Sequence, residues 1–173
     1  MKCANFINGA FVETASYMDA IDPSTLEVIG QVPLSNAQDI DNAVEAASAA
    51  FDGWSCLQPR QRAEYLFKIA DQIDANMEEL ALLESRDQGK TVAAARMIDI
   101  PRAATNFRYF AEAIITPKLD RVSYQSVPNV GDMTSVAGRV PVGVAALIAP
   151  WNLPLYLLSW KIAPAIGNIE FSL

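Results

Sequence analysis

The sequence predicts an α/β protein in which strands, a layer of helices, further strands and a strand–loop–helix unit follow one another along the chain. Three observations predict this order. Short strand-like runs lie between residues 5 and 32, and apolar residues recur at helical spacing between residues 35 and 111. The segment from Arg139 to Lys161 carries no charged residue between its two basic ends, so most of it is expected to be buried.

A β-hairpin is predicted at the start of the chain. Asn8-Gly9 lies between two short apolar pairs, and this dipeptide readily supplies the two positive φ angles of a two-residue turn. Two further strands, Tyr17–Ile21 and Leu26–Val32, flank the turn-forming sequence Asp22-Pro23-Ser24-Thr25. None of these strands carries evident catalytic chemistry.

Three helices are predicted next. Ser35 with Gln38 three residues later is typical of a capping box, and the helix it begins ends near Gly53. Pro59 suits the first turn of the second helix. The apolar face of that helix is predicted to consist of Ala63, Leu66, Phe67, Ala70 and Ile73.

The third helix is predicted to be capped by Asn76 and Glu79 and to stop at Gly89. The sequence Gly89-Lys90-Thr91 also resembles the end of a phosphate-binding loop. That motif requires a glycine five residues earlier, where Glu84 stands. Helix termination is therefore the better interpretation of Gly89.

A further helix is predicted from Asp99, with a proline in its first turn. Arg102, Asn106 and Tyr109 share one face of this helix by spacing, while Arg108 points elsewhere. An arginine in this position is usually a solvated residue or the partner of an acidic side chain. It is also suited to bind a carboxylate, because the guanidinium offers two parallel donors. The sequence leaves both interpretations open.

The final part of the chain is predicted to return to strands. Arg121–Val127 and Met133–Val140 are expected to be strands, and Val142–Ile148 is expected to be a strand buried on both faces. A tight loop, Ala149–Pro154, then leads into an apolar helix, Leu155–Ala165. Because ligands of open α/β sheets bind where strands end, this loop is the predicted ligand-binding element.

The same uncharged segment, taken from Val140 to Trp160, is about as long as a bilayer-spanning helix. Pro141, Pro150 and Pro154 interrupt it, and a proline inside a helix costs about 3 kcal/mol. We therefore do not expect membrane attachment. A membrane-attached protein is the weakest of the alternatives.

Composition excludes several classes of function. The 13 basic and 20 acidic residues give a net charge of −7, which disfavours nucleic-acid binding. The 173 residues include no histidine, so histidine-activated nucleophiles and histidine metal sites are excluded, and no metal is expected. Cys3 and Cys56 are far apart, and Cys56 is expected to be a small buried hydrophobic residue. Two cysteines favour a reducing, cytoplasmic setting.

Three motifs in order carry a resemblance to a known family. Pro141-Val142-Gly143-Val144, the sequence PWNLP at 150–154, and the sequence WKIAPA at 160–165 together resemble the N-terminal part of the aldehyde dehydrogenase superfamily. The resemblance runs from about Asn5 to Ala165. The sequences ESRDQGKT and MIDIPRAATNFRYFA look most like the 2-aminomuconic or 2-hydroxymuconic semialdehyde dehydrogenase branch.

The resemblance implies an NAD-dependent oxidation of a small-molecule aldehyde, of the muconic semialdehyde type, to a carboxylate, with NADP left open. It implies that Asn152 donates a hydrogen bond to the oxyanion of the tetrahedral intermediate. Ile148, Ala149, Pro150 and Trp151 match positions that line the cofactor groove, and Arg102 matches the arginine expected to hold the substrate carboxylate. Asn152 could alternatively form only an Asx turn, and Trp151 could belong to the core.

The resembled family continues beyond this sequence to a ribose-binding lysine, a glycine-rich loop, a glutamate base and a nucleophilic cysteine. The sequence predicts two parts, residues 1–140 with the N-terminal strands and helical layer, and residues 141–173 with the first unit of an incomplete dinucleotide-binding fold. We expect a truncated aldehyde dehydrogenase that is inactive alone and a homo-oligomer when full length. The alternative is a catalytically inactive fragment that associates with full-length subunits.

Overall fold

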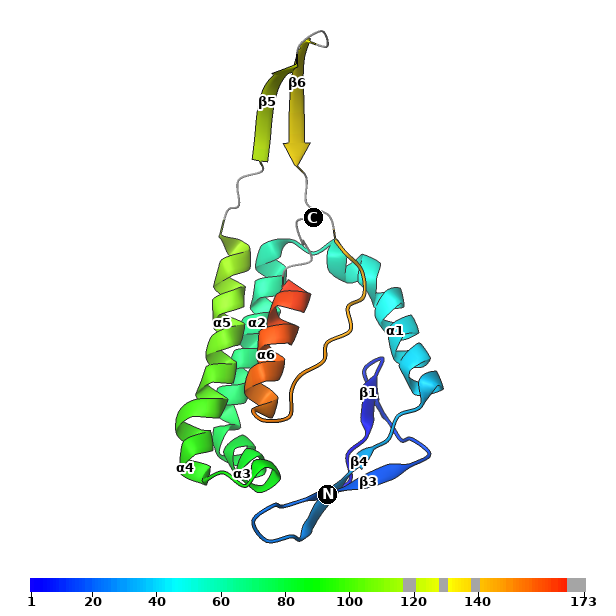
Figure 1. The fold of residues 1–173 in the computed structure, drawn as a ribbon, viewed down its shortest axis with the longest axis vertical. Helices are drawn as coiled ribbons and strands as arrows, with labels where there is room; N and C mark the ends of the chain where they lie inside the picture. Colours follow the sequence, from blue (N-terminus) through cyan, green and yellow to red (C-terminus); the bar gives the residue numbers. More distant parts are fainter. Residues whose placement is uncertain (117–120, 128–130, 138–140, 168–173) are drawn as a thin grey trace.

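The computed structural model describes residues 1–116, 121–127, 131–137 and 141–167 (Figure 1). Helices α2, α5 and α6 lie side by side and form the body of the molecule, and two small antiparallel sheets and α1 lie on one side of it. A third two-stranded sheet, β5 with β6, projects away from the helices (Figure 1). The predicted α/β class and order of elements are confirmed in outline.

The N-terminal hairpin and the strand Tyr17–Ile21 form as predicted, whereas the predicted strand Leu26–Val32 is observed as Val28–Pro33. β1 (Asn5–Ile7) and β2 (Ala10–Val12) pair antiparallel, and the turn between them has φ of 51° at Asn8 and 75° at Gly9. Phe6 and Phe11 face each other across this hairpin with ring centroids 5.2 Å apart.

β3 (Tyr17–Ile21) and β4 (Val28–Pro33) form the second antiparallel pair. The turn between them is closed by Asp22, whose carboxylate accepts from the backbone N–H of Ser24 at 2.8 Å. Asp22 also accepts from the Ser24 hydroxyl, and these bonds lower the pKa of the carboxyl group.

The predicted start of α1 (Ala37–Ser55) is wrong by one residue. Asn36, not Ser35, is the N-cap: its side chain accepts from the backbone N–H of Asp39 at 3.0 Å, and the Asp39 carboxylate in turn accepts from the backbone N–H of Asn36 at 2.9 Å. The hydroxyl of Ser35 instead bonds the side chain of Asn5, from the first hairpin. Asparagine and serine cap equally well, so the packing of the preceding residues decides between them.

Helix α2 (Pro59–Ala75) begins at the predicted proline. Helix α3 (Met77–Gln88) ends at Gly89, which has the predicted left-handed conformation with φ of 72°. A side chain at Gly89 would also meet Pro23 Cγ at 2.8 Å, so the glycine is required twice. Asn76 is the N-cap residue of α3, as predicted, but its side chain makes no capping bond; its amide instead donates to the carbonyl of Gln72 at 2.8 Å.

Asp99 does not start a helix, contrary to the prediction. The chain is already helical from α4 (Val92–Ala94) through the π-helical turn η1 (Ala95–Asp99) into α5 (Ile100–Ile115). Thr91 provides the cap, since its hydroxyl accepts from Ala94 N at 3.2 Å. Proline is tolerated at the start of α5 because its backbone nitrogen lies where the α-helical bonding pattern is interrupted.

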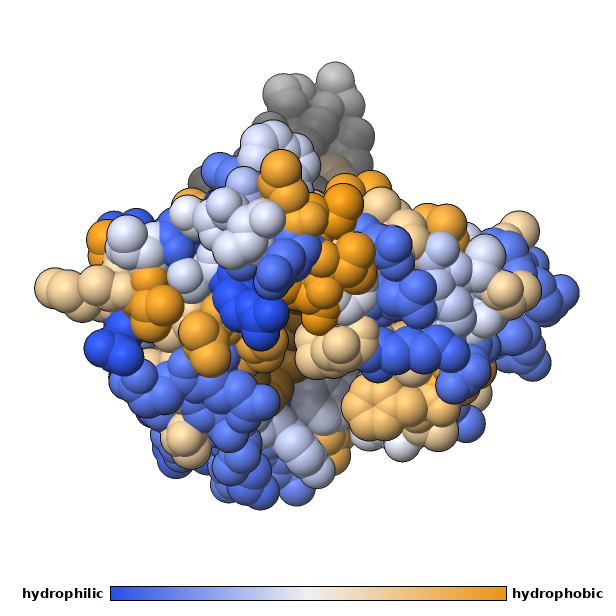
Figure 2. All heavy atoms as spheres, turned by 90° about the horizontal axis from the view of Figure 1, so that it is seen from below, coloured by the Kyte–Doolittle hydropathy of each residue, from blue (hydrophilic) through white to orange (hydrophobic). Residues whose placement is uncertain are grey.

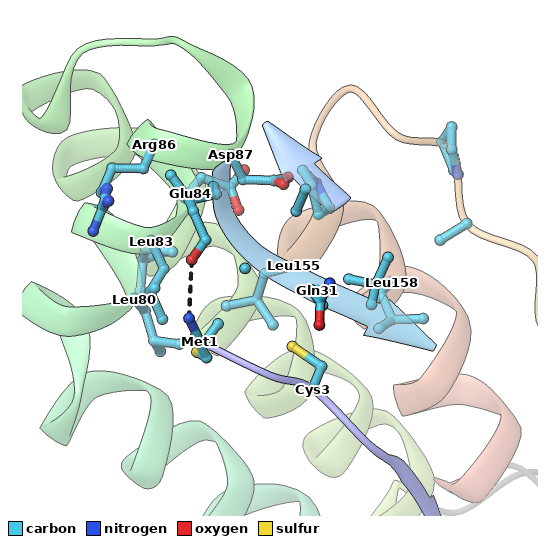
Figure 3. A pocket seen from close by; sticks show the side chains of 18 residues that line it. Met1, Cys3, Gln31, Leu80, Leu83, Glu84, Arg86, Asp87, Leu155 and Leu158 are labelled. Atoms are coloured by element: carbon cyan, nitrogen blue, oxygen red, sulfur yellow. Dashed lines mark hydrogen bonds between the residues drawn. The ribbon is translucent and has the colours of Figure 1, made fainter. Parts of the chain in front are cut away.

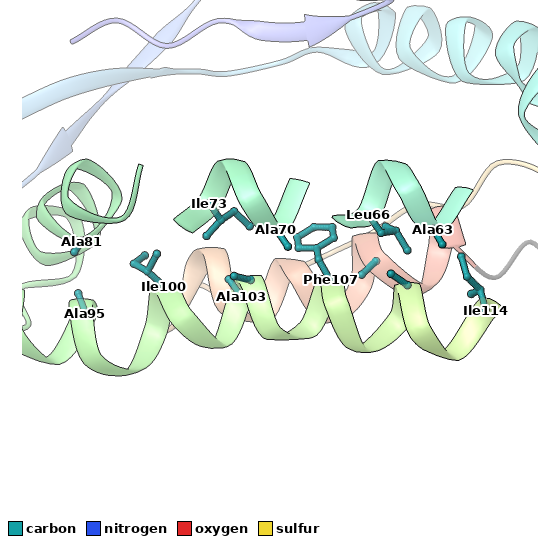
Figure 4. Packing of buried hydrophobic residues seen from close by; sticks show 13 residues of the cluster. Ala63, Leu66, Ala70, Ile73, Ala81, Ala95, Ile100, Ala103, Phe107 and Ile114 are labelled. Carbon is teal, nitrogen blue, oxygen red and sulfur yellow. The ribbon is translucent and has the colours of Figure 1, made fainter. Parts of the chain in front are cut away.

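The core lies where α2, α5 and α6 (Pro154–Gly167) meet (Figure 4). Of the five residues predicted on the apolar face of α2, four are buried and Phe67 packs against the core from its edge. The buried apolar residues of the cluster are Ala63, Leu66, Ala70, Ile73, Ala81, Ala95, Ile100, Ala103, Ala104, Phe107, Ala111, Ile114 and Ala163.

The two later strands are confirmed with one shifted boundary. β5 (Arg121–Val127) pairs antiparallel with β6 (Gly131–Ala137), so β6 begins two residues before the predicted Met133. The predicted connection at 128–130 and the predicted end of the strand at 138–140 lie outside the described residues.

The predicted buried strand Val142–Ile148 is wrong. This segment forms neither a helix nor a paired strand, and residues 141–148 are exposed. Ile148 is 84% exposed and Val142 is 69% exposed. A strand becomes buried only when neighbouring strands and helices cover it, and no described strand of this chain pairs with it along its length.

Candidate functional site

The predicted loop and helix do form. The segment Ala149–Leu153 leads directly into α6, whose first turn is closed by the bond from Leu157 N to Leu153 O at 2.9 Å. Asn152 lies exposed at the end of this loop, two residues before the helix begins. Asn152 is therefore not part of the buried core.

The far end of α6 is fixed by two side-chain donors. The indole of Trp54 donates to Ile166 O at 2.9 Å, and the guanidinium of Arg62 donates to Gly167 O at 3.2 Å. The guanidinium also donates to Leu57 O, so it joins the end of α6 to the segment after α1. A side chain at Gly167 would meet Leu66 Cδ1 at 3.0 Å, which shows how closely α6 packs on α2.

The start of α6 is fixed by polar contacts with α5. The Asn106 amide donates to the Ser159 hydroxyl at 2.8 Å, and that hydroxyl donates to the carbonyl of Tyr156 at 2.6 Å. Asn106 is 6% exposed and Ser159 is 1% exposed, so both groups of this chain of bonds are buried. One turn further along, Phe110 and Trp160 meet edge to face at 5.7 Å.

Arg102 lies against the first turns of α6. Its guanidinium carbon is 5.3 Å from the centre of the Tyr156 ring, the side chain is exposed, and among the described residues no carboxylate lies within ion-pair distance of it. Arg108, in contrast, pairs with Asp71 at 2.7 Å and with Asp74 at 2.8 Å. Of these two arginines on α5, Arg108 is therefore ion-paired within the fold, whereas Arg102 contacts an aromatic ring.

The predicted common face of Arg102, Asn106 and Tyr109 is only partly correct. Asn106 is buried against α6, whereas Tyr109 is 60% exposed. The α6-facing stripe instead runs through Arg102, Asn106 and Phe110, which recur every four residues.

Lys90, in the Gly89-Lys90-Thr91 sequence, forms ion pairs within the fold. Its ammonium group bonds Asp99 at 2.6 Å and Glu84 at 3.0 Å, and both carboxylates are buried. The glutamate that breaks the loop motif is therefore itself the partner of the lysine. Helix termination at Gly89 is confirmed.

A cavity of about 880 Å³ lies between β4, α3 and the start of α6 (Figure 3). In the close-up, Gln31 and Cys3 lie on one side, Leu80 and Leu83 on another, and Leu155 and Leu158 of α6 on the third. Figure 2 shows apolar residues gathered around a hollow on this face. The further lining residues are Met1, Ala20, Ile29, Gly30, Val32, Glu84, Arg86, Asp87, Ile100, Ala149, Pro150 and Pro154.

Only two of the four predicted cofactor-groove residues lie beside this cavity. Ala149 and Pro150 line the cavity, whereas Ile148 and Trp151 do not line it and are 84% and 83% exposed. Trp151 is thus not a core residue. Sequence reasoning missed Tyr156 and Ser159, although a buried asparagine on an otherwise apolar helix face signals that a polar partner must exist.

The remaining predicted features are simple to place. Cys3 is half-buried, and Cys56 is exposed, which corrects the expectation that it is buried; both thiols are free. Among the described residues no cluster of acidic and cysteine side chains could hold a metal ion. Within the same ranges no helix has both the length and the apolar character needed to cross a membrane.

Two relatives of this chain are semialdehyde dehydrogenases. The chain is 51% identical over 163 residues to 2-aminomuconic semialdehyde dehydrogenase of Bos taurus, covering 94% of this chain and 33% of that protein. It is 39% identical over 166 residues to 2-hydroxymuconic semialdehyde dehydrogenase of Pseudomonas sp. strain CF600, covering 94% and 34%. The chain thus spans about a third of the length of these relatives.

Solved structures share the fold. The chain matches PnpE of Pseudomonas sp. WBC-3 with a TM-score of 0.85 and 36% identity, over 96% of this chain and 34% of that one. PnpE has also been solved in complex with nicotinamide adenine dinucleotide. The sequence model of the aldehyde dehydrogenase family matches residues 11–168. This match covers most of the chain, and the chain therefore belongs to the aldehyde dehydrogenase family.

Proposed function

We propose that this chain contributes the oxyanion donor and the substrate-carboxylate site of an NAD-dependent oxidation of a muconic-type semialdehyde to a carboxylate. The observation that carries the proposal is the attachment of α6 to α5, which joins the loop bearing Asn152 to the helix bearing Arg102. About 50% identity to a 2-aminomuconic semialdehyde dehydrogenase supports the substrate class.

Each residue has a separate task in this proposal. The Asn152 amide stabilises the negative charge that develops on the aldehyde oxygen, which typically contributes about 10²- to 10³-fold in rate. Arg102 binds the carboxylate at the other end of the substrate through two parallel N–H donors. Ile148, Ala149, Pro150 and Trp151 border the cofactor; three of them are exposed and Ala149 is partly buried. When bound, NAD accepts the hydride.

The proposed organisation of the whole enzyme follows the same division. Residues 1–140 belong with cofactor and oligomer contacts, and residues 141–173 begin the dinucleotide-binding fold. We propose that the complete enzyme is a homo-oligomer in the reducing, cytoplasmic setting that its cysteine usage predicts. By itself the 173-residue chain is expected to form no NADH from NAD and an aldehyde. Steady NADH formation by the pure chain would show that this expectation is wrong.

The decisive test is a chimera in which residues 5–165 replace the corresponding segment of the Bos taurus relative. The chimera is expected to oxidise 2-aminomuconic semialdehyde. Asn152→Ala should lower kcat about 10²- to 10³-fold. Arg102→Leu should raise KM for the carboxylate-bearing semialdehyde and leave an uncharged aldehyde unaffected. Arg108→Leu is the matched control, because Arg108 is paired with Asp71 and Asp74 and should not alter this selectivity.

A second candidate function is association with full-length subunits. The exposed apolar residues of segment 142–148 favour it, since such surface is normally covered by another element or chain. Co-expression of the chain with a tagged full-length relative distinguishes the two: recovery in the tagged complex supports association, and recovery only in the unbound fraction excludes it.

A further inference from the structure

The contact between Arg102 and Tyr156 is one of several that align α5 with α6. Along α5, Arg102, Asn106 and Phe110 contact, in that order, Tyr156, Ser159 and Trp160 of α6. Both sets of residue numbers increase together, so the two helices run in the same direction, as Figure 1 also shows. The tyrosine ring therefore meets the guanidinium at a position fixed by the register of the whole interface.

The hydrogen bonds beside this contact fix that register. Asn106 donates to the Ser159 hydroxyl, and the same hydroxyl donates to the backbone carbonyl of Tyr156. A rotation of α6 or a slide along α5 would leave the buried Asn106 amide without its acceptor, which is unfavourable. Tyr156 is thus linked through Ser159 to Asn106, which lies one turn after Arg102 on α5.

We propose that Tyr156 is a positioning residue for Arg102, with the Asn106–Ser159–Tyr156 chain of bonds holding the ring in place. A long arginine side chain at the surface normally samples many rotamers, and the ring selects those in which the guanidinium lies over it. In the stacked form of this contact, which the proposal assigns to Arg102, the face of the guanidinium lies on the ring and its N–H edge stays free. This arrangement leaves the two parallel donors available to a carboxylate, and it rests on the proposed role of Arg102 as the carboxylate-binding residue.

The first test needs no enzyme activity and uses the unmodified 173-residue chain. Nuclear Overhauser contacts between the Tyr156 ring protons and the Arg102 side-chain protons are expected, together with an upfield ring-current shift of the Arg102 side-chain resonances. Absence of both would overturn the proposal, and this measurement stands even if a variant fails to fold.

Variants then separate positioning from general stability. Tyr156→Phe keeps the ring and should preserve the Arg102 resonances, whereas Tyr156→Leu should move them downfield. Tyr109→Leu is the control. Tyr109 is an exposed tyrosine on α5, the helix of Arg102, and its ring does not contact the Arg102 guanidinium. An Arg102 resonance that is the same in Tyr156→Leu as in the native chain contradicts the proposal.

Carboxylate binding is tested with trans,trans-muconate as the probe, followed through the Arg102 resonances. Tyr156→Leu should weaken binding about two- to fivefold, the effect of a solvent-exposed cation–π contact, and Tyr156→Phe should restore native affinity. If muconate leaves the native Arg102 resonances unchanged while the ring contact is present, the carboxylate role of Arg102 is rejected and its positioning by Tyr156 stands. Equal affinity in Tyr156→Leu and the native chain rejects a positioning effect on binding.

Discussion

Ser159 is a small polar residue on an apolar helix, and its hydroxyl both accepts from Asn106 and donates to Tyr156 O. Ser159→Ala removes both bonds and leaves a buried amide without an acceptor. We expect a loss of about 1–3 kcal/mol in the free energy of unfolding, measured by urea denaturation. Thr105→Ala is the matched control: Thr105 also bonds a backbone carbonyl, that of Pro101, but is exposed. Equal losses for the two variants would refute this prediction.

At the residue scale, short sequence motifs single out candidate site residues but do not reveal their contacts. The asparagine between two prolines and the arginine after Pro101 are recognisable from short motifs, and both prove to be exposed. The partner of Asn106 is 53 residues away in sequence, and spacing within one helix carries no information about the neighbouring helix. Capping suffers from the same limit, since Ser35 and Asn36 are equally suitable and a bond from Asn5 decides between them.

At the scale of elements, Lys90 joins the end of α3 to η1 through Glu84 and Asp99. Lys90→Met would leave two buried carboxylates without their cation. We expect a loss on the order of 3 kcal/mol in unfolding free energy at neutral pH. The control is Arg96→Met, which removes the exposed pair with Glu78 and should cost about 0.5 kcal/mol or less. A Lys90→Met variant as stable as the control would show that the cluster contributes little.

The same cluster predicts a pH dependence. Burial lowers the pKa of Lys90, but hydrogen bonds from its ammonium group to Asp99 and Glu84 outweigh this effect and hold the pKa above its ordinary value of 10.5. A raised lysine pKa stabilises the fold below the unfolded-state value and ceases to do so as pH rises through the folded-state value. The stability difference between the native chain and Lys90→Met should therefore shrink above about pH 10.5. A difference that stays constant to pH 12 would contradict this account.

Elements that depend on local sequence are predicted well. The Asn8-Gly9 turn, the proline start of α2 and the glycine end of α3 each follow from backbone preference, and all three are observed. The segment 142–148 was predicted incorrectly because an apolar, β-rich run becomes a strand only if a partner strand is available. The helix start predicted at Asp99 was wrong for a related reason. An acidic residue shortly before a proline resembles a helix start, but here the Asp99 carboxylate accepts a hydrogen bond from Lys90.

At the scale of the whole molecule, segment 142–148 exposes several apolar side chains. Val144 and Ile148 are 45% and 84% exposed in a segment without regular secondary structure, which favours association with other chains. The double variant Val144→Thr, Ile148→Thr should show less concentration-dependent self-association in sedimentation velocity. The control is Leu26→Asn, at a residue 79% exposed with φ of 62°, a conformation that asparagine tolerates; this variant should associate like the native chain. An unchanged sedimentation profile in the double variant would exclude this segment as the cause.

The π-helical turn Ala95–Asp99 bears on how the length of the protein can change over evolution. Each α-helical residue rotates the chain by about 100°, and a π turn holds one surplus residue within an otherwise continuous helix. Loss of a residue such as Met97, which is 77% exposed, can restore an ordinary α-helix while α5 keeps its packing. The loss then rotates the segment before η1 relative to α5, and this rotation separates Lys90 from Asp99. A lineage can thus shorten the chain here without disturbing Arg102, provided that it replaces the ion cluster at the same time.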